Sequence, residues 1–92
     1  MIGCADCECL IYHAGSLKEK RAVLQRITSR IRQKYNVSIA ETDYQDLWQR
    51  TRFGIVAITS DKTSTERVLQ SVLQFIDSFP EIERTITSIE WL

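Results

Sequence analysis

The alternation of apolar and polar positions predicts the first element of this chain, a strand over residues 2–12. One side of the predicted strand carries Ala5, Cys7, Cys9 and Ile11, and the other side carries Asp6, Glu8 and Leu10. A period of two residues is that of a β-strand with one buried face. We therefore expect the first of these two sides to face the core.

A helical pattern follows this strand. Ser16 is a favourable N-cap residue, and Glu19 three positions later completes a capping box. The apolar residues behind it recur at helical spacing and form one stripe, made of Leu17, Val23, Leu24, Ile27, Ile31 and Tyr35. The helix is predicted to end near Tyr35 and Asn36, where Asn suits a C-terminal turn.

The remaining pattern predicts two strands, a second helix and a final strand. "NVSIAETDY" and "RFGIVAITS" are the two strands, and "YQDLWQR" reverses the chain between them. The second helix opens within residues 61–64, with Thr63 and Glu66 at capping-box spacing, and Pro80 stops it. Residues 84–91 alternate again and place Thr85, Thr87, Ile89 and Trp91 on one face.

The resulting order, βαββαβ, predicts an α+β protein of the ferredoxin-like class. We expect residues 1–92 to form a single domain, a four-stranded antiparallel sheet with two helices on one face. In this topology the segments "HAGSLKEKR", "TDYQDLWQR" and "FPEIE" share one end of the domain. That end is the candidate functional surface.

Charge is distributed unevenly along a chain whose formal net charge is zero. Residues 16–35 carry seven basic residues and one acidic residue, so this segment is +6 and the rest is −6. The basic residues proposed to contact phosphates are Lys18, Arg21, Arg26, Arg30 and Arg32. The third strand offers the single aromatic Phe53, so the sequence favours a contact made by the helix over one made by the sheet.

Lys20 stands apart because it lies at the centre of the apolar stripe. Its stem can pack inward while its ammonium emerges at the shared end, near Asp43 and Asp46. There it forms either an ion pair that ties the helix to the reversal or a ligand contact. Within the reversal, Gln45, Trp48 and Arg50 are candidate anchors, provided that Trp48 is exposed rather than folded over the core.

The cysteines Cys4, Cys7 and Cys9, with His13 nearby, resemble a set of metal ligands. Alternation places Cys7 and Cys9 on the buried face and Cys4 on the opposite one, so one zinc ion could not collect all three. We therefore expect core cysteines, with no metal and no cofactor. The sequence also lacks a recognisable catalytic constellation. It shows no signal peptide and no apolar run that could span a membrane, and these two features favour a cytoplasmic protein.

Four segments together resemble the YlxP-like family of small bacterial proteins of unknown function. They are "SLKEKR", "NVSIAE", "DLWQR" and "FIDSFPEIE", and the resemblance covers nearly the whole chain. It implies the ferredoxin-like fold and, through operons shared with translation and ribosome-maturation genes, a ribosome-associated role. The chain differs from the family in "IYHAG", where members often carry a proline, and in its cysteines, which replace plain hydrophobic residues.

Three functional hypotheses follow from these observations. The first is a module that binds ribosomal RNA or a ribosomal subunit through the basic helix and the reversal at residues 43–50. The second is a homodimer or higher oligomer that uses the open face of the sheet. The third is a small-ligand or enzymatic site near Lys20, which requires this lysine to be unpaired.

Overall fold

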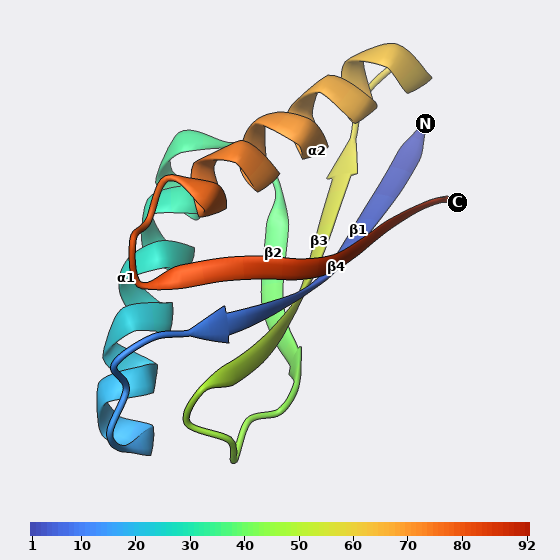
Figure 1. The fold of residues 1–92 in the computed structure, drawn as a ribbon. Helices are drawn as coiled ribbons and strands as arrows, with labels where there is room; N and C mark the ends of the chain where they lie inside the picture. Colours follow the sequence, from blue (N-terminus) through green and yellow to red (C-terminus); the bar gives the residue numbers. More distant parts are fainter.

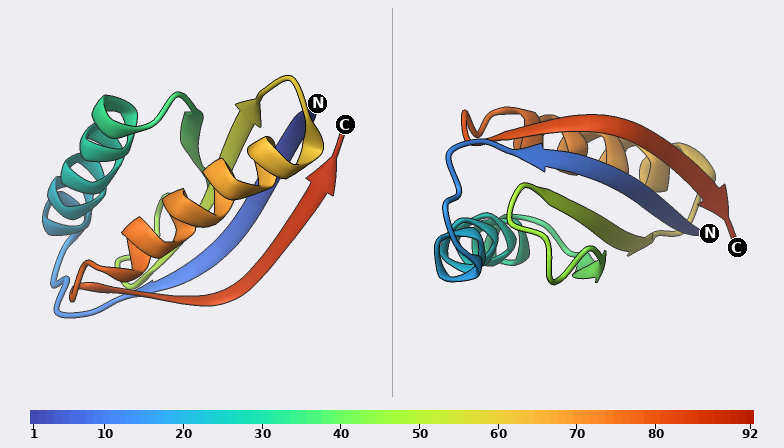
Figure 2. Two further views of the ribbon diagram at one scale, coloured as in Figure 1. Left: turned by 90° about the horizontal axis from the view of Figure 1, so that it is seen from above. Right: turned by 60° about the horizontal axis from the view of Figure 1, so that its bottom comes forward.

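A computed structural model describes residues 1–92 and confirms the predicted order of elements (Figure 1). The elements are β1 (Ile2–Ile11), α1 (Leu17–Lys34), β2 (Ser38–Asp43), β3 (Arg50–Ile58), α2 (Lys62–Asp77) and β4 (Ile82–Trp91). The four strands form one antiparallel sheet in the order β2-β3-β1-β4. Both helices cover the same face of this sheet (Figure 2), so the ferredoxin-like prediction is confirmed. Neither helix has the length and apolar character needed to cross a membrane.

The buried core lies between the sheet and the two helices. Its sheet side includes Phe53 and Ile55 of β3, and its helix side includes Ile27 of α1 and Leu69 of α2, all fully buried. Because α1 packs against β2 while α2 packs against β1 and β3, α1 lies beside one edge of the sheet. This placement leaves the outer flanks of α1 open to solvent.

The alternation predicted for β1 is confirmed. Cys7 and Cys9 are buried in the core, and Cys4 lies partly exposed on the opposite face of the sheet. The neighbouring Cys7 thiol, and then burial, raise the pKa of Cys9 well above that of a free thiol. Cys9 is therefore protonated at neutral pH and packs as an apolar side chain.

The N-terminus of α1 is capped much as the sequence predicts. Ser16 Oγ accepts a hydrogen bond from the Glu19 N–H at 3.1 Å. The Glu19 carboxylate accepts from the N–H of Gly15 at 2.7 Å, one residue before the usual partner in a capping box. The cap thus orients the first turn, which carries the lysines of the shared end.

α2 opens within residues 61–64, as predicted, but the capping-box pair Thr63 and Glu66 does not form its cap. Asp61, rather than Thr63, is the N-cap, and its carboxylate accepts from the Ser64 N–H at 2.8 Å. The Ser64 hydroxyl donates to the other carboxylate oxygen at 2.9 Å. An Asp at this position accepts both bonds, so the helix begins at Lys62.

The face predicted for Thr85 is also wrong, because β4 contains a β-bulge. The register pairs Cys9 with Arg84 and Cys7 with Thr87, which leaves one extra residue in β4. Arg84 therefore comes to the helix side, where its Nε donates to Asp77 Oδ1 at 2.8 Å. Thr87, Ile89 and Trp91 keep their predicted face because they lie beyond the bulge.

Candidate functional site

The predicted shared end of the domain exists in the structure. The N–H of Ile11, the last residue of β1, donates to the carbonyl of Gln49 in the loop between β2 and β3 at 2.9 Å. The next N–H, that of Tyr12, donates to the carbonyl of Glu81 at 2.8 Å. In Figure 1 the start of α1 and the β2–β3 hairpin lie together at the end away from both chain termini.

Lys20 is the buried link between α1 and this hairpin. Its side chain is 1% exposed, and its Nζ lies 3.0 Å from Glu41 Oε2. Nζ also donates to the carbonyl of Tyr44 at 2.5 Å. Glu41 Oε2 in addition accepts from the hydroxyl of the buried Thr51 at 2.6 Å. Of the two predicted contacts of Lys20, the structure therefore has the ion pair between helix and hairpin, with Glu41 as the acid.

The predicted partners of Lys20, Asp43 and Asp46, are wrong. Glu41 stands opposite Phe53 in the register, and Phe53 faces the helices, so the Glu41 carboxylate also faces α1. Asp43 lies beyond a register shift in β2, and its carboxylate accepts from the N–H of Tyr44 instead. Asp46 is exposed in the loop. Since Lys20 is engaged by Glu41 and Tyr44, the hypothesis of a free catalytic or ligand-binding lysine is weakened.

Tyr44 begins the turn of the β2–β3 hairpin. Its φ is 63°, a left-handed conformation that a non-glycine residue adopts only when its surroundings enforce it. The Tyr44 carbonyl accepts from the Leu47 N–H at 3.0 Å, and its hydroxyl donates to Glu8 Oε1 at 3.0 Å. That bond to Glu8 raises the pKa of Tyr44, so its hydroxyl remains a donor at neutral pH.

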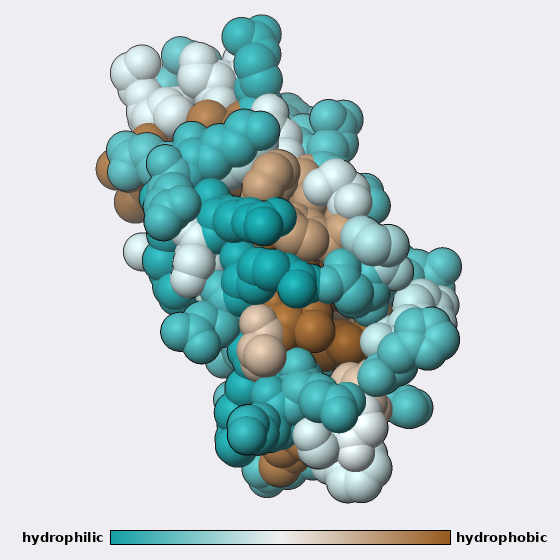
Figure 3. Space-filling view, turned by 90° about the vertical axis from the view of Figure 1, so that its left-hand side faces the viewer, coloured by the Kyte–Doolittle hydropathy of each residue, from teal (hydrophilic) through white to brown (hydrophobic).

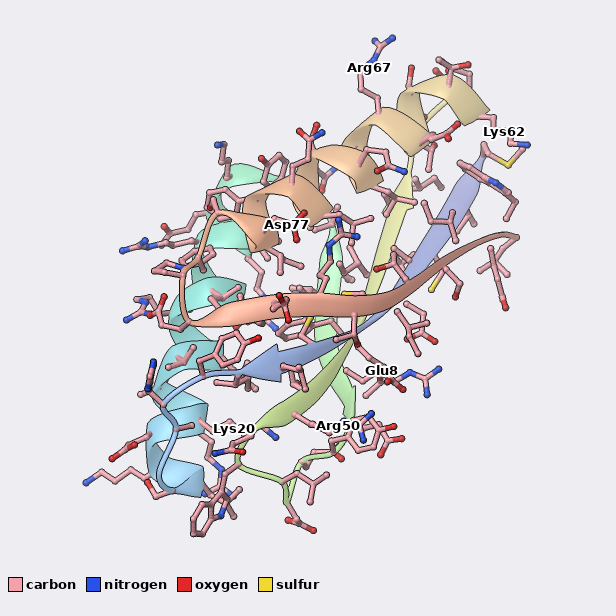
Figure 4. The ribbon with its side chains drawn as sticks, viewed as in Figure 1. Glu8, Lys20, Arg50, Lys62, Arg67 and Asp77 are labelled. Carbon is pink, nitrogen blue, oxygen red and sulfur yellow. The ribbon has the colours of Figure 1, made fainter.

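Arg50 completes the support of the hairpin. Its Nη2 donates to Glu8 Oε2 at 3.1 Å, and its guanidinium lies 4.6 Å from the centre of the Tyr44 ring. Figure 4 shows Arg50 and Glu8 pointing toward one another across the sheet. Arg50, which the sequence predicts as part of an anchor for a partner, thus also makes a structural contact that holds the base of the hairpin.

The tip of the hairpin is exposed. Of the two positions left open by the sequence for Trp48, the structure has the exposed one, since this side chain is 51% accessible. Leu47 beside it is 46% accessible, and Gln45 is also exposed. An open hollow of about 470 Å³ is lined by Asp46, Leu47, Trp48, Gln49 and Arg50.

The basic residues on the hairpin side of α1 differ in their contacts. Lys18 and Arg21 are exposed in the first two turns and form no ion pair within the chain. Arg32 lies about three turns further along the same flank. Its Nη2 donates to the carbonyl of Ile39 at 2.8 Å, which covers part of the β2 edge.

The basic residues on the other flank of α1 are already engaged. Arg26 forms an ion pair with Glu81, which ties α1 to the connection before β4. The guanidinium of Arg30 lies 5.7 Å from the centre of the Phe79 ring. Figure 3 shows the side of the molecule on which α1 lies, where hydrophilic side chains flank a narrow hydrophobic strip. Of the predicted phosphate contacts, Lys18 and Arg21 are therefore the least restrained.

The open face of the sheet carries an ion-pair network in its centre. Arg52 donates two hydrogen bonds to Asp6, one of them from Nε to Oδ1 at 2.7 Å. Away from the hairpin, the same face exposes the apolar side chains of Ile2, Val56 and Ile58. This face is therefore polar at the hairpin end and apolar at the end where the termini lie.

The Asp6–Arg52 pair predicts a dependence of stability on pH. Arg52, through its hydrogen bonds, holds the pKa of the Asp6 carboxyl below its ordinary value of 3.8. The stabilisation is present above that value and is lost as the pH falls through the lower folded-state pKa. Urea unfolding of the wild type is thus expected to lose more stability between about pH 4 and pH 2 than unfolding of Asp6→Asn. Parallel curves for the two proteins would contradict this assignment, since the depressed pKa of Asp61 is common to both.

No group of three or more His, Cys, Asp or Glu side chains is arranged to hold a metal ion. The three cysteines are free, and two of them are enclosed in the core. The groups exposed at the shared end are the cations Lys18 and Arg21, the indole of Trp48 and the side chains of Gln45 and Asp46.

Comparison with known proteins gives two matches that cover nearly the whole chain. The family model described as "Protein of unknown function (DUF503)" matches residues 2–89. "Uncharacterized protein YlxP" from Bacillus subtilis (strain 168) is 68% identical over 91 residues, which cover 99% of each chain. The resemblance to YlxP-like proteins is confirmed by both.

Proposed function

We propose, for a chain that belongs to the DUF503 family of proteins of unknown function, a role in binding structured RNA, with ribosomal RNA or a ribosomal subunit as the target. The contact surface is the end formed by the start of α1 and the β2–β3 hairpin, which we call the α1–hairpin end (residues 18–21 and 43–50). The family resemblance implies a ribosome-associated role, and ribosomal RNA is the ligand of that setting that the exposed cations suit.

The observation that carries this proposal is the pairing state of the cations on α1. Lys20 forms an ion pair with Glu41, and Arg26 forms one with Glu81. Lys18 and Arg21, in contrast, are exposed and have no acidic partner. Exposed cations of this kind attract phosphates and release counterions when they bind them. Arg32 extends the same positive flank along the helix.

A salt titration tests the proposal directly. The full chain is titrated into purified bacterial ribosomal subunits, and separately into a transcribed structured ribosomal RNA, at salt concentrations from about 50 to about 200 mM. The logarithm of the affinity is expected to fall linearly with the logarithm of the salt concentration, because phosphate contacts release counterions. Absence of binding at the lowest salt would contradict the proposal.

A second candidate function is self-association through the open face of the sheet. The observation in its favour is the group of exposed apolar side chains at the terminus end, of which Ile58 is 63% accessible. Exposed apolar patches mark interaction surfaces. Sedimentation of the chain as a monomer at high concentration excludes this candidate and leaves the RNA-binding proposal intact.

A further inference from the structure

The hollow at the hairpin tip combines an aromatic surface with hydrogen-bonding groups. Trp48 offers a half-exposed indole, and Asp46 and Gln49, which bear a carboxylate and a carboxamide, line the same hollow. Asp46 takes part in no ion pair within the chain. Its carboxylate therefore remains an acceptor for donors that come from outside.

The hollow is also held in place by bonds that reach the rest of the fold. On one side, Lys20 Nζ donates to the Tyr44 carbonyl, and this carbonyl also receives the Leu47 N–H. On the other side, the Ile11 N–H donates to the carbonyl of Gln49. A loop fixed at both ends loses less conformational entropy when it binds a partner. The exposed indole of Trp48 therefore lies on a loop whose backbone is anchored to the rest of the fold.

These features match the requirements for an unpaired nucleobase. Sequence-tolerant recognition of single strands stacks bases on exposed aromatic side chains, and carboxylates and carboxamides pair with base edges. An apolar protein side chain would gain from Trp48 and Leu47 but would leave the Asp46 carboxylate without a donor. The uncompensated cations Lys18 and Arg21 at the same end favour a phosphate-bearing ligand.

We infer that the hairpin hollow binds one unpaired nucleobase of the RNA, an inference that rests on the proposed function. The base stacks on the indole of Trp48, and the Asp46 carboxylate accepts a hydrogen bond from an exocyclic amino group of the base. The Gln49 amide donates to an acceptor on the same edge. Lys18 and Arg21 bind the neighbouring phosphates, so single-stranded loops are preferred over continuous duplex.

Two RNA probes of the same sequence test this inference, one single-stranded and one fully paired with its complement. The full chain is expected to bind the single strand more tightly than the duplex. Trp48→Ala is expected to lower the affinity for the single strand by about tenfold and to leave the affinity for the duplex unchanged within about twofold. Trp48→Phe keeps an aromatic ring, so it is expected to retain most of the single-strand affinity.

The outcomes separate this inference from the proposed function. If Trp48→Ala leaves the single-strand affinity unchanged, or lowers both affinities equally, the nucleobase assignment is overturned while RNA binding stands. If the wild-type chain binds neither probe at low salt, this inference fails, whereas the proposed function fails only if the chain also does not bind ribosomal subunits and structured ribosomal RNA at low salt. Because Trp48 is exposed, both variants are expected to unfold at the wild-type urea midpoint, and this unfolding measurement is the control.

Discussion

Replacing Lys20 with methionine is expected to lower the free energy of unfolding by about 3 kcal/mol. Methionine fills the space of the lysine stem but removes the charge that faces Glu41 and the donor that binds the Tyr44 carbonyl. The Glu41 carboxylate is then left partly buried without its counter-charge. The expected loss lies at the lower end for a broken buried pair because Glu41 is 22% exposed and can recruit water.

The free energy of unfolding is measured with urea, and two further variants serve as a control and as a rescue. Lys18→Met changes an exposed lysine in the first turn of the same helix and is expected to cost less than about 0.5 kcal/mol. Glu41→Gln in the Lys20→Met background removes the unpaired charge and keeps a side chain that can accept from Thr51. This double variant should recover part of the lost stability. Equal effects of Lys20→Met and Lys18→Met would contradict the assigned role of Lys20.

Reversing the charges of Lys18 and Arg21 is expected to weaken RNA binding by about 60-fold at about 0.1 M salt. At that concentration each phosphate contact contributes a factor of about eight through counterion release, and two contacts are lost. Both side chains are exposed, so Lys18→Glu/Arg21→Glu should fold normally. The readout is the equilibrium affinity for the structured ribosomal RNA.

The matched control for this charge reversal lies on the other helix. Lys62 and Arg67 are exposed on α2, away from Lys20 and the hairpin (Figure 4). Lys62→Glu/Arg67→Glu changes the net charge of the chain by the same amount. This control is expected to weaken binding only slightly, because the lost attraction acts from outside the α1–hairpin end and is screened by salt. Equal losses in the two double variants would point to non-specific attraction by net charge.

The architecture could be predicted from the periodicity of the sequence because each helix and strand has a single buried face. The two-residue period of β1 and the stripe on α1 were sufficient to identify the core, including Cys7 and Cys9. The sequence predicted the wrong face for a residue where one extra residue in a strand shifts the alternation of its side chains. The bulge in β4 moves Arg84 to the helix side, and nothing in the alternation of residues 84–91 indicates it.

The site was predictable only in part. The position of Lys20 within the apolar stripe correctly indicated a buried ammonium at the shared end. The choice of Glu41 over the nearby aspartates depends on the register of β2 against β3, which the sequence does not reveal. The exposure of Trp48 likewise depends on the hydrogen bonds that hold Tyr44 and Gln49. Its pairing with Asp46 and Gln49 around one hollow could be seen only in the structure.

The measurement that tests RNA binding at the α1–hairpin end most directly is the salt slope of RNA affinity, compared between the wild type and the two charge-reversal variants. The slope of log affinity against log salt should become shallower by about two in Lys18→Glu/Arg21→Glu, because two phosphate contacts are removed. In Lys62→Glu/Arg67→Glu the slope should remain that of the wild type. A slope that is unchanged by the first variant, or reduced equally by both, would contradict the account.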